Sequence, residues 1–435
     1  MTPTTSDTKD WTKTVFIWLE GDSEAVPAGL LTVYEQGIRP VRSTFVYGNR
    51  YRERKNAISV DPESLSLVAA NRTGKPVTFE PPAQLALFGA IRDAAPDSWG
   101  RRVIENMVQA VPNSLPETDY LMHAGPHRTG ALDFRDSPTA KAETGKLPGA
   151  KDLKYLLDAS AMIQEGRPVP RNLEAYFTVG ATFGGARPKA VLLDKGRQWL
   201  AKFPALNDGF NVPLIERATL ELARQCGLRV PELAMVRLAD GRDVMLIERF
   251  DRVPLATGVF ARRHIVSALT MLQLHENDTT RAQYADLAEV LNTHGASGFV
   301  AHDKVELFRR MVFNILVSND DDHLRNHAFV WEGARGGWRL SDLYDVVPKP
   351  QVASQRYLVL GVGRKGRLAT LDNAFSAAGQ FGIRANDAVA YINEIASVVR
   401  EWRTYFDEFG VPQSECDKVA SAFRNPKDIG LALLS

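Results

Sequence analysis

Apolar residues recur with different periods along the chain, and the change of period predicts where strands give way to helices. Residues 12–134 contain β-prone runs, such as residues 14–19, together with a helical stretch around residues 85–111. Beyond Arg252 the spacing is helical. The helices expected there are residues 265–274, 284–291, 305–317 and 388–406, the last with Asn386 or Asp387 as its N-cap.

The middle of the chain combines two hairpins with one amphipathic helix. Apolar residues repeat at four-residue spacing in the helix, and Gly227 is placed to end it. β-branched residues and intervening turns mark the strands. In order, the expected elements are strands at residues 190–193 and 198–204, the helix at residues 215–226, and strands at residues 230–238 and 243–250.

A polar stretch rich in Ser, Pro, Thr, Gly and Lys, residues 135–151, is the best candidate for a linker. It separates an N-terminal subdomain, residues 1–134, from a segment of strands and helix at residues 152–252. The helical remainder spans residues 253–435. These patterns predict an α+β fold, with an N-terminal α/β subdomain and a mostly helical C-terminal lobe.

Composition narrows the class of protein. The 435 residues are 44% hydrophobic and 24% charged, as in a globular protein large enough for two or three domains. A net charge of +1 argues against nonspecific nucleic-acid binding as the main role. Cys226 and Cys416 are too few for a disulfide framework, and no apolar run is long enough to span a bilayer. We therefore expect a cytoplasmic protein without a membrane partner.

Three consecutive acids, Asp320, Asp321 and Asp322, follow directly on the apolar end of the helix predicted at residues 305–317. Adjacent carboxylates repel one another, so solvent, a cation or a basic partner has to offset the repulsion. Two interpretations are open. The acids form a solvated loop in which one of them caps a helix, or they belong to a catalytic loop with a magnesium–phosphate site.

A hairpin predicted after this loop favours the catalytic interpretation. Residues 328–331 and 338–340 have strand patterns around a glycine-rich turn, and Asp345 follows between apolar neighbours. Because the two ends of a hairpin lie side by side, Asp321 and Asn326 are expected to approach Asp345. Phosphoryl-transfer enzymes use such a set, one acid for the substrate hydroxyl and an Asn and an Asp for magnesium.

A kinase also needs a phosphate loop, a lysine on a strand and an acid on a helix. Residues 180–189 are rich in glycine, although a hairpin turn is the commoner explanation of such a segment. Lys202 stands among apolar neighbours, and Glu216 opens the following helix and could pair with it. Alternatively, Lys202 is a snorkelling edge residue and Glu216 an ordinary first-turn acid.

The last strand of the second hairpin ends in the charged run at residues 248–252. In a kinase this position is the hinge between the lobes, where backbone groups bind adenine. Taken by itself, the run also fits an exposed strand end with surface salt bridges.

Four segments together resemble, in order and spacing, the HipA-like serine/threonine kinases of bacterial toxin–antitoxin modules. Each motif is weak alone, but four in register are specific. Two more segments, residues 95–102 and 130–134, are similar to the family's N-terminal subdomain, so the resemblance covers nearly the whole chain. It implies a two-lobed, protein-kinase-like fold. The four segments are residues 184–189, 247–252, 319–326 and 342–345.

The resemblance implies a role for each candidate residue. Asp321 would be the catalytic base, and Asn326 and Asp345 would hold Mg²⁺. Asp320 and Asp322 would shape or solvate the loop, and His323 would brace it by hydrogen bonding. The residues expected to bind the nucleotide, ATP, are Gly184, Gly185, Lys189, Lys202, Glu216, Glu248, Phe250 and His323.

Thr182 matches the position at which members of the family phosphorylate themselves, commonly on a serine. Threonine is a competent acceptor, although its extra methyl group stiffens the rotamer. A phosphate there would add up to about two negative charges where the ATP phosphates are expected. The resemblance therefore implies inhibition by autophosphorylation.

The implied function is an ATP- and Mg²⁺-dependent protein kinase that arrests growth by phosphorylating a translation-related protein, such as an aminoacyl-tRNA synthetase. The alternative is a catalytically weak corepressor that mainly binds a HipB-like helix-turn-helix antitoxin on operator DNA. The intact set Lys202, Asp321, Asn326 and Asp345 favours the kinase. No helix-turn-helix is evident in the chain, so contact with DNA is expected to be indirect. The Asp-Asp-His run also resembles a metal-hydrolase cluster, although the only nearby second histidine is His327.

Overall fold

The computed structural model describes residues 8–433 except residues 73, 143–144, 171–184 and 257. The chain forms two compact units, and each is built from separate stretches of sequence. The first unit comprises residues 1–206 and 248–275, and the second comprises residues 207–247 and 276–435. These units do not follow the predicted boundaries at residues 134, 151 and 252, so the division into functional lobes stays a prediction.

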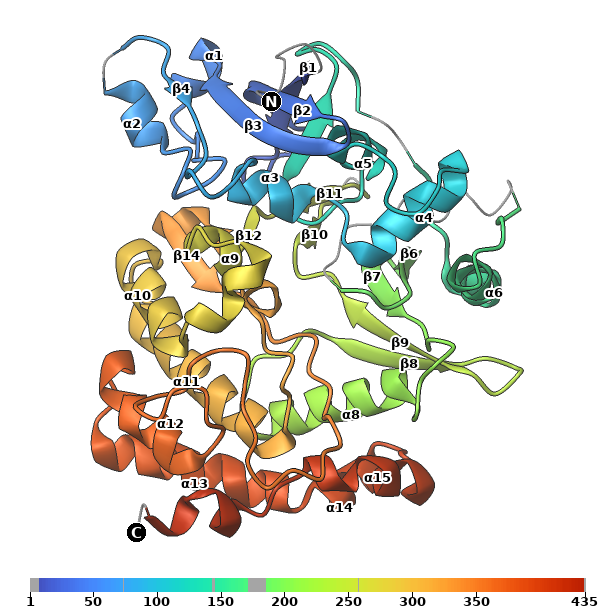
Figure 1. Ribbon diagram of the computed structural model, residues 1–435, viewed down its shortest axis with the longest axis vertical. Coiled ribbons are helices and arrows are strands. Elements are labelled where there is room, and N and C mark those ends of the chain that lie inside the picture. The colour runs from blue at the N-terminus through green and yellow to red at the C-terminus, as the bar shows by residue number, and fades with distance from the viewer. Residues whose placement is uncertain (1–7, 73, 143–144, 171–184, 257, 434–435) are drawn as a thin grey trace, which may run out of the picture. The chain divides into compact units, whose positions relative to one another are not determined.

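An antiparallel sheet with the strand order β4-β3-β2-β1-β5 forms the first part of unit 1 (Figure 1). Alternate residues such as Val15, Leu31 and Phe45 are fully buried, as expected for a sheet with one face on a core. The strand predicted at residues 14–19 is confirmed but starts earlier. The strands are β1 (Thr8–Ile17), β2 (Val26–Gln36), β3 (Arg39–Tyr47), β4 (Thr78–Phe79) and β5 (Leu132–Arg135).

The single helical stretch predicted around residues 85–111 is two helices, α3 (Gly89–Ala94) and α4 (Ser98–Val108). The break lies at Pro96, because a proline forces the residue before it into an extended conformation. Asp97 then caps α4 by accepting a hydrogen bond from the amide of Gly100 at 2.7 Å. The other helices before residue 171 are α1 (Asn49–Arg52), α2 (Leu67–Asn71), α5 (Glu117–His123), the short 3-10 helix η1 (Ala150–Asp152) and α6 (Leu153–Gln164).

The first predicted hairpin in the middle of the chain is confirmed as β6 (Lys189–Asp194) and β7 (Arg197–Lys202), which pair antiparallel. Lys195 and Gly196, at its tip, both have positive φ, as a tight two-residue hairpin turn requires. A small ladder of β10 (Arg252–Pro254) and β11 (Phe260–Arg262) follows later in unit 1.

The helix predicted at residues 265–274 is wrong over its first turn. Residues 265–267 form strand β12 (Ile265–Ser267), and only α9 (Ala268–Met271) is helical. The β-branched Ile265 and Val266 favour the extended conformation. The side chain of Ser267 then caps α9 by accepting from the amide of Thr270 at 3.3 Å.

Unit 2 begins with α8 (Val212–Gln225), which confirms the helix predicted at residues 215–226 and starts three residues earlier. Asn211 caps it, and Gly227, with φ of +72°, ends it. The hairpin of β8 (Leu233–Arg237) and β9 (Asp243–Glu248) follows and confirms the second hairpin predicted for the middle of the chain.

Helix α11 (Val300–Val317) is the centre of unit 2. Leu307, Phe308, Met311 and Ile315 are fully buried where α11 packs against α10 (Tyr284–His294), α12 (Leu371–Ala377) and α13 (Ala385–Arg400). The predicted hairpin after α11 is confirmed as β13 (Ala328–Glu332) and β14 (Gly337–Leu340), with Trp331 opposite Trp338. The short 3-10 helices of this unit are η2 (Glu276–Arg281), η3 (Leu324–Asn326), η4 (Gly333–Arg335), η5 (Ala378–Phe381), η6 (Ala420–Ala422), η7 (Pro426–Ile429) and η8 (Leu431–Leu433).

The helix predicted at residues 388–406 divides at Glu401 into α13 and α14 (Trp402–Glu408), and α15 (Gln413–Val419) follows. The predicted N-cap is wrong. Arg384 occupies the N-cap position, and Asp387 lies in the first turn, where it pairs with Arg384 at 2.7 Å. None of the described helices has both the length and the hydropathy that crossing a bilayer requires.

Candidate active site

The acidic loop begins where α11 ends. Ser318 has a left-handed conformation, with φ of +51°, which turns the chain out of the helix. Its hydroxyl donates to the carbonyl of Ala422 at 2.6 Å and accepts from Arg356 at 2.5 Å. The amide of Asn319 donates to the carbonyl of Asn314 at 3.0 Å. These bonds fix the direction in which the loop leaves the helix.

The first and third acids of the loop have protein partners. Asp320 accepts a hydrogen bond from Gln351 at 2.6 Å and pairs with Lys349 at 3.1 Å. Asp322 is buried and accepts from the amide of Val359 at 2.6 Å. Burial raises the pKa of Asp322 to about 7. These three contacts attach the loop to the segment at residues 349–359.

Asp321, between these two acids, lies next to Asn326, and the negative charge of Asp345 affects its pKa. The side-chain amide nitrogen of Asn326 donates to the backbone carbonyl of Asp321 at 2.7 Å. Burial raises the pKa of the Asp321 carboxyl, and the negative charge of Asp345 raises it further, while His323 and Lys349 act in the opposite direction. Both ends of the hairpin belong to unit 2, and the assignment of Asp321 as the catalytic base stays a prediction.

Asp345 itself has φ of +58°, which is unusual for a residue other than glycine. The preceding residue, Tyr344, donates its hydroxyl to the carbonyl of Arg325 at 2.8 Å. This bond holds the segment that carries Asp345 against the loop that carries Asn326. Such conformations persist only where neighbouring contacts determine them, and they cluster at functional sites.

The donor set suits Mg²⁺. A hydrogen bond that uses the amide nitrogen of Asn326 leaves its oxygen to coordinate, and the carboxylate of Asp345 is the second oxygen ligand that the sequence predicts. Mg²⁺ commonly takes one or two protein oxygens and completes its shell with water and nucleotide phosphates. Over the described ranges, there is no group of three or more His, Cys, Asp and Glu side chains that could hold a metal ion together.

His323 contributes to the loop through its backbone. Its carbonyl accepts from the amide of Asn326 at 2.8 Å, which closes the turn, whereas its ring nitrogen Nδ1 is buried without a hydrogen-bond partner among the described atoms. His327 is fully buried, and its ring packs edge-on against Tyr284 with centroids 5.3 Å apart. Burial lowers the pKa of His327 to about 3, so this ring is neutral.

Lys202 and Glu216 belong to different units. Lys202 is the last residue of β7 in unit 1, and Glu216 is a buried residue of α8 in unit 2. Their proposed pairing stays a prediction. Thr182 and Gly184 lie outside the described residues.

Lys189, the last residue of the glycine-rich segment, is buried in unit 1 and pairs with Asp97 at 2.5 Å. The same ammonium donates to the carbonyl of Gly185 at 3.2 Å. Sequence reasoning missed Asp97 as a partner, although its position before Ser98 and Trp99 marks it as a helix cap. The contact anchors the described end of the glycine-rich segment, and the nucleotide-binding role of Lys189 and Gly185 stays a prediction.

The charged run at residues 248–252 is more buried than the surface interpretation expects. Glu248 pairs with Arg197 at 2.9 Å and is partly exposed. Next to Phe250, the Asp251 carboxylate accepts from Arg249 at 2.8 Å and from Arg252 at 2.6 Å, and all three charged side chains are buried. The pairing is therefore internal to unit 1, and adenine binding at Glu248 and Phe250 stays a prediction.

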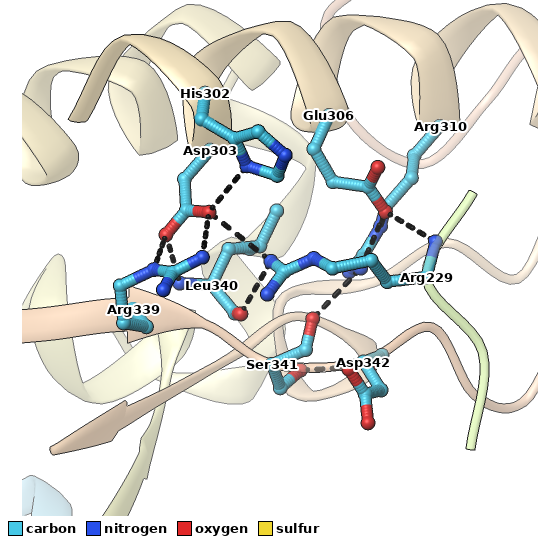
Figure 2. Close-up of polar contacts among 9 residues, drawn as sticks. All are labelled: Arg229, His302, Asp303, Glu306, Arg310, Arg339, Leu340, Ser341 and Asp342. Carbon is cyan, nitrogen blue, oxygen red and sulfur yellow. Dashed lines mark hydrogen bonds and ion pairs between the residues drawn. The ribbon is translucent and has the colours of Figure 1, made fainter. Parts of the chain in front are cut away.

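Sequence reasoning also missed a set of charged residues on α11 that contact Arg229 and the hairpin of β13 and β14. Asp303, Glu306 and Arg310 on α11 contact Arg229 and the end of β14 (Figure 2). The only sequence signal is the spacing of Glu306 and Arg310, which places both on one helix face. The partners far along the chain leave no local pattern.

The chain is similar to a known protein family and to several known proteins. The HipA-like C-terminal domain family matches residues 181–402. A protein of Sinorhizobium fredii named "Putative kinase Y4dM" is 28% identical over 188 residues, 40% of this chain and 44% of that protein. A Haemophilus influenzae protein named "Putative kinase" is 25% identical over 275 residues, 56% of this chain and 76% of that protein. The chain thus spans less than half the length of the first of these relatives.

A solved structure extends the likeness to the whole fold. The toxin HipA of Shewanella oneidensis, determined in complex with HipB and operator DNA, matches with a TM-score of 0.63 over 97% of this chain and 96% of that chain, at 16% sequence identity. The predicted α+β, kinase-like fold is confirmed by this match. With a family match over residues 181–402, the chain belongs to the HipA-like C-terminal domain family.

Proposed function

We propose that the chain is an ATP- and Mg²⁺-dependent serine/threonine protein kinase. The observation that supports the proposal is that one hairpin connects the loop of Asp321 and Asn326 to the segment of Asp345, and that Tyr344 in this segment bonds the carbonyl of Arg325 in the loop. A base, an amide oxygen and a carboxylate are the groups that phosphoryl transfer requires beside the nucleotide. The names of the bacterial relatives support the same activity.

In the proposed reaction, the carboxylate of Asp321 accepts a hydrogen bond from the substrate hydroxyl and takes its proton as the oxygen attacks. The γ-phosphoryl group passes from ATP to that oxygen, and ADP leaves. When bound, Mg²⁺ would neutralise charge on the phosphates. Asn326 and Asp345 would hold the ion, and the bond from Asn326 to the Asp321 carbonyl couples the ligand to the base.

We further propose a toxin role in the cytoplasm, with a helix-turn-helix antitoxin as partner and a translation-related protein as substrate. The full-length likeness to HipA, which was solved with HipB and operator DNA, supports this role. Phosphorylation of Thr182 would then inhibit the enzyme by placing negative charge where the ATP phosphates are expected.

The test is incubation of the purified chain with γ-labelled ATP and a cell lysate, with Mg²⁺ or with a chelator in excess. We expect labelled protein only with Mg²⁺. Asn326→Ala should raise the Mg²⁺ concentration needed for half-maximal labelling by about tenfold, because one of two protein ligands is lost. Labelling that is indifferent to the chelator would reject the magnesium assignment.

A further inference from the structure

The segment that leads into Asp345 is attached to α11 by a buried ionic cluster (Figure 2). Asp303 lies at its centre and is 1% exposed. Its carboxylate accepts two hydrogen bonds from Arg339 on β14, at 2.7 and 2.9 Å, and one from the backbone amide of Leu340 at 3.0 Å. One acid thus holds a side chain and the backbone of the same strand.

Arg229, four residues after the end of α8, extends the cluster from the last residue of β14 to the residues that follow it. Its guanidinium donates to Asp303 at 3.2 Å and to the carbonyl of Leu340 at 2.8 Å. Its backbone amide donates to Glu306 at 3.1 Å, and its backbone carbonyl accepts from the amide of Leu343 at 2.8 Å. Arg229 therefore contacts the segment before Asp345 at two backbone positions.

Arg310 supplies a second attachment from α11. Its guanidinium donates to the carbonyl of Ser341 at 2.7 Å and to Glu306 at 2.9 Å. Burial alone would raise the pKa of Asp303, but the hydrogen bonds from Arg339 and the charge of Arg229 outweigh it and lower that pKa. The acid is thus ionised at neutral pH and keeps its arginine partners.

These contacts bear on the geometry of the active site. Backbone groups of Leu340, Ser341 and Leu343 are held just before Asp345, whose own conformation is strained. Helix α11, which holds Leu340 and Ser341 of this segment, runs directly into the loop of Asp321 and Asn326. The same helix therefore contacts the segment before Asp345 and continues into the loop of Asp321 and Asn326. Buried ion pairs add little net stability over apolar packing.

We propose that Asp303, with Arg229 and Arg339, is a positioning cluster that sets Asp345 relative to Asp321 and Asn326, and thereby the affinity for the metal–nucleotide complex. This inference rests on the proposed kinase function. None of these residues touches the reacting atoms. We expect substitutions in this cluster to weaken metal and nucleotide binding more than they lower the free energy of unfolding.

The test measures Mn²⁺ binding to the full chain in the presence of a non-hydrolysable ATP analogue. The electron paramagnetic resonance signal of free Mn²⁺ reports how much of the ion stays unbound. Asp303→Asn keeps the size of the side chain but removes its charge, and we expect the apparent Kd for Mn²⁺ to rise about tenfold. The matched control is Glu394→Gln. It breaks the ion pair of Arg309, also on α11, with α13 at 2.9 Å, and we expect unchanged Mn²⁺ affinity.

The outcomes separate the two proposals. No Mn²⁺ binding by the wild type with the analogue would refute the metal–nucleotide site and the proposed function with it. Binding that is equal in wild type and Asp303→Asn would overturn the positioning cluster alone. A loss of the same size in Glu394→Gln would also overturn it, because general destabilisation of α11 would then explain the effect.

A second variant decides the matter if Asp303→Asn does not fold. Arg339→Lys keeps the charge but cannot make both bonds of a planar guanidinium to Asp303. We expect a folded protein with about threefold weaker Mn²⁺ binding and a higher KM for Mg·ATP, with kcat changed less. Unchanged affinity and unchanged KM in the folded variant would contradict the inference.

Discussion

At the scale of single residues, three neighbouring acids differ because their surroundings differ. Asp320 is paired with Lys349, Asp322 is buried against Val359, and Asp321 lies beside Asn326. The sequence indicates that one of the three is catalytic, since it shows the cluster and the hairpin after it. It cannot show that Asp322 is the buried one of the three.

The raised pKa of Asp322 predicts a pH dependence of stability. Its pKa is about 7 in the folded chain and close to 3.9 in the unfolded chain, so between these values only the folded state holds the proton. The free energy of unfolding should therefore fall between pH 5 and pH 7 by up to about 1.4 kcal/mol per unit. Asp322→Asn should remove this fall. Thermal unfolding at pH 5, 6, 7 and 8 measures it, and parallel curves for the two proteins would contradict the prediction.

The lowered pKa of Asp251 predicts the opposite dependence of stability on pH. Burial alone would raise its pKa, but Arg249 and Arg252 outweigh burial and lower it below the unfolded value. Its stabilising contribution is then present above about pH 4 and is lost as the pH falls toward the lowered pKa. We expect Asp251→Asn to cost about 3–5 kcal/mol at pH 7 and less at pH 3, by urea unfolding.

The exposed pair of Asp240 with Arg242 provides the control for Asp251. Asp240→Asn should cost under about 1 kcal/mol at either pH, because exposed pairs contribute little. A cost of Asp251→Asn that stays constant from pH 7 to pH 3 would show that the charge of this carboxylate does not matter.

At the scale of elements, periodic segments were predictable and interrupted ones were not. Helices α8, α10 and α11 and the hairpin of β13 and β14 follow from spacing and turn residues alone. The failures lie where a local signal interrupts an apolar pattern. Pro96 divides one predicted helix in two, and Ile265 and Val266 form a strand where the first turn of another helix was predicted. At these positions, tertiary contacts and local stereochemistry outweighed the helical spacing of the apolar residues.

Asn211 tests how far a cap stabilises α8, the helix that carries Glu216. Its side chain accepts from the amide of Leu214 at 3.3 Å and donates to Asp243 at 2.7 Å. We expect Asn211→Ala to lower the free energy of unfolding by about 1–2 kcal/mol in urea. Ser66→Ala, at the cap of the short exposed helix α2, should cost less, and an equal cost in both variants would count against the prediction.

At the scale of the whole molecule, the family and the fold were recognisable from four motifs in register, whereas the compact units were not. Each unit takes in two distant stretches of sequence, and no change of composition marks residues 206, 247 or 275. The positioning cluster shows the same difficulty. Arg229 and Leu340 meet across more than one hundred residues, and sequence spacing carries no record of such a contact.

The most direct measurement for the whole account is phosphoryl transfer by Asp321→Asn beside Asp320→Asn, at saturating Mg²⁺ and ATP. Both substitutions remove one charge from the same loop, but only Asp321 is assigned as the base. We predict that Asp321→Asn lowers the rate at least about 100-fold, as expected for loss of a general base, and that Asp320→Asn changes it only a few-fold. Equal rates in the two variants would contradict the assignment of Asp321 and the kinase mechanism built on it.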